Sequence, residues 1–150
     1  PLGAWIAVAG QFNPAPVLLG LAVMSWVAGF DILYSCQDHE YDKGVGLHSI
    51  PVRFGLVGAL RLARILHVMT IVFMLCVGTV AGLRWIYFAG VGAITLLLCW
   101  EHRLVRPDDL TKVNTAFMTA NSIISVAYFA FTLTDLLLLG DQPLWAVSVP

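Results

Sequence analysis

The sequence predicts an all-α membrane protein that crosses the bilayer about four times. Of its 150 residues, 59% are hydrophobic and only 11% are charged, whereas soluble domains contain roughly 25% charged residues. The mean hydropathy is +0.86. The apolar residues also form unbroken runs, and a run of about 20 such residues is long enough to cross a bilayer as a helix.

Four apolar runs are long enough to be membrane spans. Strands are disfavoured because the runs are long and because lipid requires backbone groups to pair within each segment. We expect spans at about 15–36, 55–82, 85–100 and 113–139 within one domain covering 1–150. The first residues look like the end of a helix already under way, and there is no initiator Met. We therefore expect the chain to be a piece of a longer protein.

The positions of the basic residues predict an orientation in the membrane. One basic residue, Arg84, lies in the short turn between the second and third spans. The other seven lie in or beside the two long loops: Lys43, Arg53, Arg61, Arg64, Arg103, Arg106 and Lys112. The positive-inside rule then places the long loops in the cytoplasm, and we expect the inner (plasma) membrane of a prokaryote.

The same topology assigns an aromatic belt to the opposite membrane interface. Trp85, Tyr87 and Trp145 belong to this belt because they flank the short turn or follow the last span. The net charge of −1 predicts no nucleic-acid partner. The chemistry of the protein must therefore be sought where charged residues meet the ends of the spans.

Acidic residues gather at the end of the first span. With Asp31 set at 0° and a helix advancing about 100° per residue, Asp38 falls at about −20° and Asp42 at about +20°. Tyr34 falls at about −60°, so three carboxylates and a phenol share one stripe. Glu40 points the opposite way.

This acidic stripe predicts a metal site. Like charges one turn apart repel, and an acid near the bilayer core costs roughly 3 kcal/mol, so a bound cation would remove both costs. Mg²⁺ is typically held by one or two carboxylates together with water and substrate phosphates. We predict that Asp38 and Asp42 bind a Mg²⁺ ion that bridges to a diphosphate. Lys43 and Arg53 are placed to contact its phosphate oxygens. A solvated helix end is the simpler interpretation of the stripe.

The pattern Asp31-x-x-Tyr34-x-x-x-Asp38-x-x-x-Asp42 resembles the second aspartate-rich motif of the UbiA prenyltransferases. The following loop is similar to the same family and most similar to its 4-hydroxybenzoate polyprenyltransferase branch; it contains Lys43, His48, Ser49, Pro51, Arg53 and Gly55. The stretches 106–110 and 114–121 fit that branch less specifically. The resemblance covers essentially the whole chain.

The resemblance implies a bundle of nine spans around a central cavity, of which this chain forms the C-terminal half. Two aspartate-rich motifs would bind Mg²⁺ ions that hold polyprenyl diphosphate, whose prenyl group is transferred to an aromatic acid such as 4-hydroxybenzoate in ubiquinone or menaquinone synthesis. Asp38 and Asp42 would be metal–diphosphate ligands, with Asp31 and Tyr34 lining the same cavity. The first motif, of NDxxDxxxD form, is absent from these residues. We therefore expect the N-terminal half to be missing and the chain to be inactive alone.

Two other functions were compatible with the acids. A non-enzymatic, cation-binding half of a membrane transporter predicts cation-coupled flux without affinity for diphosphate. A CDP-alcohol phosphotransferase also carries a DxxxD pattern on a span, but it needs an upstream DG…AR stretch that this sequence lacks.

The remaining polar candidates have two interpretations each. His48 and Ser49 either contact the diphosphate or cap the next helix, and capping is favoured slightly. Asn114 and Asn121 are seven residues apart, on nearly one helix face; they either bond between helices or line the cavity.

Three ionisable residues in or near the spans are predicted to be structural. Arg64 is expected to anchor the membrane interface, and Asp135 to be an interfacial residue. His67 is expected to have a polar partner within the bundle. A haem site is disfavoured because His48, His67 and His102 are predicted to lie at different levels.

Overall fold

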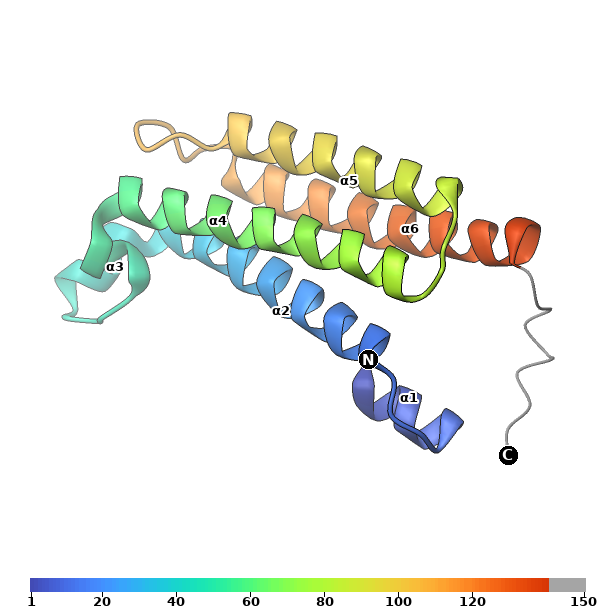
Figure 1. The fold of residues 1–150 in the computed structure, drawn as a ribbon. Helices are drawn as coiled ribbons and strands as arrows, with labels where there is room; N and C mark the ends of the chain where they lie inside the picture. Colours follow the sequence, from blue (N-terminus) through green and yellow to red (C-terminus); the bar gives the residue numbers. More distant parts are fainter. Residues whose placement is uncertain (141–150) are drawn as a thin grey trace.

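The computed structural model describes residues 1–140, apart from the side chains of residues 115–117, and this part of the chain is helical with no strand. The elements in order are α1 (Leu2–Ala9), α2 (Pro14–Ser35), the 3₁₀ turn η1 (Cys36–Asp38), α3 (His39–Gly44), α4 (Ile50–Val80), α5 (Trp85–Leu104) and α6 (Val113–Leu139). The four long helices lie alongside one another, and the loops join them at the two ends of the bundle (Figure 1).

The two ends of the bundle differ in what they carry (Figure 1). One end, called the motif end below, has α3 and the two long loops 45–49 and 105–112. The other end, called the turn end, has the short connection 81–84 between α4 and α5. The two long loops thus lie on one side, as the distribution of basic residues predicted.

Within residues 1–140, four helices are long and apolar enough to cross a membrane, which confirms the predicted fold class and the number of spans. The predicted bounds differ most for the second and third spans. Helix α5 continues to Leu104 rather than ending near residue 100, because its last turn packs Leu98 and Glu101 into the bundle.

The predicted start of the second span at residue 55 marks a kink rather than the first residue of the helix. Helix α4 begins at Ile50, and Gly55 interrupts it with a φ of 69° and a ψ of 164°. A positive φ of this kind favours glycine. Ile50–Phe54 therefore form a separate helical turn that projects from the main part of α4 at the motif end.

The acidic stripe does not lie on one uninterrupted α-helix, which corrects the geometry assumed from the sequence. Helix α2 starts at Pro14 and ends at Ser35; its N-cap is Asn13, whose Oδ1 accepts a hydrogen bond of 2.8 Å from the Ala15 N–H. The 3₁₀ turn η1 follows before α3 begins. A 3₁₀ turn winds more tightly than an α-helix, so Asp42 is rotated away from the direction of Asp31.

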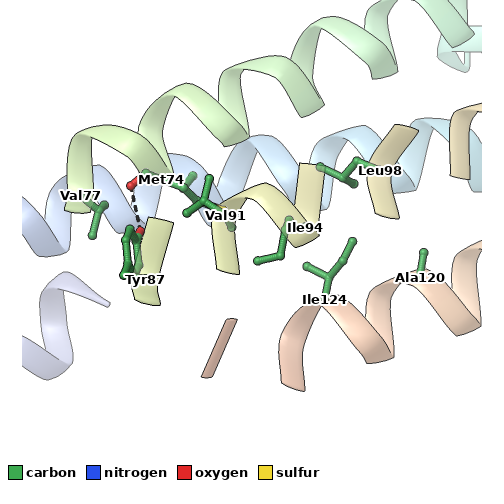
Figure 2. Packing of buried hydrophobic residues seen from close by; sticks show 9 residues of the cluster. Met74, Val77, Tyr87, Val91, Ile94, Leu98, Ala120 and Ile124 are labelled. Atoms are coloured by element: carbon green, nitrogen blue, oxygen red, sulfur yellow. Dashed lines mark hydrogen bonds between the residues drawn. The ribbon is translucent and has the colours of Figure 1, made fainter. Parts of the chain in front are cut away.

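Two hydrophobic clusters hold the helices together. The first joins all four long helices near the turn end and includes Ala22, Met74, Val91, Ile94 and Ile124 (Figure 2). The second lies nearer the motif end and includes Ile32, Leu33, Cys36, Leu60, Val105 and Val113. The small residues in both clusters let helix backbones approach closely, which is the usual basis of packing in lipid.

A network of hydrogen bonds fixes the turn end. The Asp135 carboxylate accepts bonds from the Arg84 N–H at 2.7 Å and the Tyr87 N–H at 3.1 Å. The Tyr87 hydroxyl donates to the Met74 carbonyl at 2.8 Å (Figure 2). Asp135 is only 1% exposed and caps N–H groups at the start of α5, where a helix offers no acceptor of its own. Its place at the membrane interface stays a prediction.

The two described members of the predicted aromatic belt differ in exposure, and the belt itself stays a prediction. Trp85 is exposed at the turn end, but Tyr87 is buried. Tyr87 also packs edge-on against Phe88 and Tyr128. Its hydroxyl has a carbonyl partner within the bundle and does not need the interface. Trp145 lies outside the described residues.

Candidate functional site

The predicted site residues on α2 and η1 lie on the outer side of this bundle. Asp31, Tyr34 and Asp38 are exposed, whereas the intervening Ile32 and Leu33 are buried. No ion pair within the described part of the chain involves Asp31 or Asp38. Their side chains are therefore available on one face of the helix and are not used to hold these four helices together.

Asp42 differs from the other acids of the motif because it is buried. Its side chain is 9% exposed, and its carbonyl accepts a hydrogen bond of 2.8 Å from the Leu47 N–H. Gly46 makes this loop possible with a φ of 74°. Asp42 is thus held in a defined place, one short turn from the exposed Asp38.

Three basic or polar residues follow the acids along the chain. Lys43 ends α3, and His48 lies in the loop before α4; both are exposed. Arg53 is exposed on the short helical turn before the Gly55 kink, and its guanidinium carbon lies 5.5 Å from the centre of the Phe54 ring. The loop therefore presents positive charge at the same end of the bundle as the carboxylates.

Two other predicted residues have buried polar atoms without a hydrogen-bond partner. Ser49 occupies the N-cap position of α4, but its hydroxyl makes no capping bond, so the position predicted for a cap is correct and the predicted bond is absent. Among the residues that the structure describes, neither side-chain atom of the Asn121 amide has a hydrogen-bond partner. Asn114, in the first turn of α6, is exposed. Buried polar atoms are normally paired, so Ser49 and Asn121 are the candidates for contact with a ligand.

The donor set at Asp38 and Asp42 fits the chemistry of Mg²⁺ but does not complete a site. Two carboxylates are the number that Mg²⁺ commonly takes from a protein, with water and phosphate oxygens as its other ligands. Within residues 1–140, no group of three or more His, Cys, Asp or Glu side chains is arranged to hold a metal. These two acids would need further oxygen ligands from water, a phosphate or another segment.

The second long loop is ordered by its own hydrogen bonds. Arg106 and Asp109 form an isolated backbone bridge, and the Asp109 carboxylate accepts bonds from the Thr111 N–H and hydroxyl. These hydrogen bonds lower the pKa of Asp109. The carboxylate therefore stays ionised, and the turn stays intact, to a lower pH than for a free aspartate.

A buried polar cluster in the middle of the bundle was only partly anticipated. His67 Nδ1 lies 2.9 Å from His102 Nε2 and 3.8 Å from Glu101 Oε2. The predicted polar partner of His67 is thus confirmed, whereas the prediction that His67 and His102 lie at different levels is wrong. Glu101 was missed, although an acid inside a span is a signal for a functional site. It is 1% exposed, and its oxygens make no hydrogen bond.

These observations define an integral membrane protein made of antiparallel transmembrane helices with an acidic motif at one end. The family model described as "UbiA prenyltransferase family" matches residues 1–123. The chain belongs to this family, as the motif at Asp31–Asp42 suggested.

The curated relatives reported below have one name in common, and each is much longer than this chain. The chain is 31% identical to a 4-hydroxybenzoate octaprenyltransferase of Marinobacter nauticus, over 79% of this chain and 40% of the relative. It is 30% identical to a protein of the same name from Aeromonas salmonicida, over 88% of this chain and 46% of the relative. The chain thus spans less than half the length of these relatives. No solved structure matches it significantly.

Proposed function

We propose that this chain is one part of an enzyme that transfers a polyprenyl group from polyprenyl diphosphate to an aromatic acid resembling 4-hydroxybenzoate, in quinone biosynthesis. Family membership supports prenyl transfer, and the names of the relatives support the acceptor. The observation that carries the proposal is the set of exposed acids on α2 and η1, at the end of a transmembrane helix that carries no other charge.

The acids have separate roles in this proposal. Asp38 and Asp42 hold Mg²⁺, and Asp31 and Tyr34 line the cavity that receives the diphosphate. When bound, Mg²⁺ would neutralise charge that develops on the diphosphate as the allylic C–O bond breaks. Asp42 is buried while Asp38 is exposed, so Asp42 would provide the more fixed ligand and Asp38 the more accessible one.

The loop after the acids stabilises the leaving group. Lys43 and Arg53 bring positive charge to the same end of the bundle as the carboxylates, and His48 can donate a further hydrogen bond. The Ser49 hydroxyl lacks a partner and is therefore available to a phosphate oxygen. Positive charge and hydrogen-bond donors placed where negative charge develops are the usual means of lowering such a barrier.

Two asparagines of α6 are proposed to contact the aromatic acceptor. Asn121 is partly buried and neither of its amide atoms has a partner, so it can both donate to and accept from a phenol or carboxylate. Asn114 lies seven residues earlier, on nearly the same face. The apolar surroundings would keep water from the allylic cation.

The rest of the site comes from another segment of the whole protein. The first aspartate-rich motif implied by the resemblance is not among these residues, so we propose that an N-terminal half completes the metal site and that this chain alone is inactive. The motif end would face the cytoplasm, because seven of the eight Lys and Arg residues lie toward it. The membrane would be the inner membrane of a prokaryote.

An assay of the full-length parent tests the proposal. The protein would be supplied with polyprenyl diphosphate and 4-hydroxybenzoate, with Mg²⁺ or with a chelator, and prenylated product would be measured. We expect product only with Mg²⁺, and none from residues 1–150 alone. A full-length protein that conducts a cation flux but forms no prenylated aromatic product would overturn the assignment in favour of a transporter.

A further inference from the structure

A pocket of about 600 Å³ lies between α4 and α5, away from the residues proposed for prenyl transfer. Its lining includes Arg64 and His67 from α4 and His102 and Arg103 from α5. None of these residues belongs to the acidic motif or to the loop that follows it. The pocket therefore needs its own explanation.

The pocket has a polar end and an apolar end. Along α4 the lining changes from Arg64 to Val72, and along α5 it changes from Arg103 back to Thr95. Both stretches are nine residues long, so their ends lie about 12 Å apart along the helix. Because consecutive helices α4 and α5 run in opposite directions, both arginines meet at the end nearer the C-terminus of α5. The other end is lined mainly by aliphatic side chains, with Thr95 on α5.

The polar wall of this pocket is held in place by buried groups. His67 is 3% exposed, and its Nδ1 lies 2.9 Å from His102 Nε2, which fixes the ring of His102 at the pocket. His67 fits only because Gly29 of α2 has no side chain: a Cβ there would lie 2.3 Å from the His67 ring. Such preorganisation distinguishes the pocket from a chance gap between two helices.

The charge of the pocket favours an anionic ligand. Arg64 and Arg103 line it, and no carboxylate is among its lining residues. The nearby acid, Glu101, lies behind the histidines, 3.8 Å from His67, and is 1% exposed. Basic pockets between transmembrane helices near the cytoplasmic interface characteristically bind anionic lipid headgroups.

We propose that the α4–α5 pocket binds an anionic phospholipid. Its phosphate lies between Arg64 and Arg103 and accepts a hydrogen bond from His102, and one acyl chain lies along Val68, Ile71 and Leu98. His67 acts as a positioning residue that orients His102. This proposal does not depend on the reaction assigned to the acidic motif.

Polyprenyl diphosphate also has an anionic head and an apolar tail, but the pocket suits it less well. A diphosphate that leaves in the reaction needs metal ions to neutralise it, and the pocket offers no carboxylate to hold one. The two guanidinium groups can instead each pair with one of the two non-bridging oxygens of a phosphodiester, without a metal ion. We therefore assign the pocket to the lipid and use the diphosphate as a competitor in the test.

The test uses the full-length parent in nanodiscs of phosphatidylcholine with or without phosphatidylglycerol. Phosphatidylglycerol that stays bound to the released protein is counted by native mass spectrometry. We expect the Arg64→Gln/Arg103→Gln variant to bind it about 30-fold more weakly, because each basic residue near the surface contributes about 1 kcal/mol. Arg64→Lys/Arg103→Lys should retain most of the binding. The matched control is Arg61→Gln, since Arg61 is exposed on the same helix and does not line the pocket.

Cys99 provides a second readout because it is exposed and lines the pocket. Phosphatidylglycerol should slow the reaction of Cys99 with a membrane-permeant maleimide, measured on its peptide. Equal binding by the double glutamine variant, or displacement of the lipid by polyprenyl diphosphate, would overturn the proposal. A Cys99 that never reacts would show that another part of the parent covers the pocket, which would also overturn it.

Discussion

The turn end and the motif end of the bundle differ in whether their polar side chains have hydrogen-bond partners within the protein. At the turn end, the Asp135 carboxylate accepts two backbone N–H groups and the Tyr87 hydroxyl donates to a carbonyl. At the motif end, Asp31 and Asp38 are exposed and the Ser49 hydroxyl has no partner. Carboxylates and hydroxyls are thus hydrogen-bonded within the protein at the turn end, whereas at the motif end they remain available to a ligand.

This difference separates groups that serve the fold from groups that serve a ligand. Leaving a buried polar group such as the Ser49 hydroxyl unpaired costs about 1–3 kcal/mol. Since the polar groups at the turn end are paired, we infer that those at the motif end are kept for a ligand. If the interpretation is correct, changes at the motif end should alter activity with little effect on stability. Changes at the turn end should do the reverse.

The largest effect is expected from removing an acid of the motif. In the full-length parent, Asp38→Ala or Asp42→Ala should lower the rate of prenyl transfer about 100-fold or more, because each removes a ligand for the ion that stabilises the leaving group. Product formation at saturating substrates measures this. The control is Glu40→Ala, since Glu40 is exposed and its ion pair among the described residues is with His39, at 3.7 Å. Unchanged activity in either Asp variant would remove that residue from the mechanism.

Asp135→Ala should produce the next largest effect, on stability rather than catalysis. It leaves the N–H groups of Arg84 and Tyr87 without their acceptor, at a total cost of about 2–4 kcal/mol. The thermal unfolding temperature of the full-length protein should fall, while activity at low temperature persists. Asp108→Ala is the control because Asp108 is exposed in a loop. Equal unfolding temperatures for Asp135→Ala and wild type would contradict the capping role.

A smaller loss of stability is expected from Gly78→Ala. A Cβ at this position would lie 2.6 Å from the Tyr87 ring, and overpacking of this kind costs about 1–3 kcal/mol. In contrast, Gly92→Ala should be neutral or slightly stabilising, because no atom lies within 4 Å of its Cβ and alanine favours the helix. Thermal unfolding of both variants provides the comparison. Equal destabilisation by the two would show that close packing at Tyr87 is not the cause.

The smallest effect is expected from Asn121→Ala. The informative result is whether the substitution changes the KM or the stability. Because the Asn121 amide has no partner, its removal should leave the unfolding temperature nearly unchanged and raise the KM for the aromatic acceptor about tenfold, which is the loss of about one hydrogen bond. The control is Ser125→Ala, whose hydroxyl bonds to a backbone carbonyl of its own helix. A drop in stability with an unchanged KM would assign Asn121 to the fold.

The sequence predicted the helices well and their polar contacts poorly. Runs of apolar residues set the number of spans, and most of their limits agree with the structure. The pattern of apolar residues did not predict the kink at Gly55 or the 3₁₀ turn at residues 36–38, both of which change the direction of the chain. The 3₁₀ turn changes the direction of Asp42 relative to Asp31. A helical projection misses such changes because it assumes a constant rise and twist along the helix.

The polar contacts that the sequence did not reveal are those whose partners lie far apart along the chain. Asp135 meets Arg84 and Tyr87 about 50 residues earlier, so nothing in its own span revealed the cap. The pairing of His67 with His102 across 35 residues has the same origin.

By itself, the sequence determined that this is a four-helix membrane segment with a UbiA-type acidic motif, because apolar length and motif spacing are local properties of the chain. The tertiary structure decided which polar groups form hydrogen bonds within the protein and which remain available to a ligand. That decision depends on which side chains from different helices come within hydrogen-bond distance, and only the packing of the helices sets those distances.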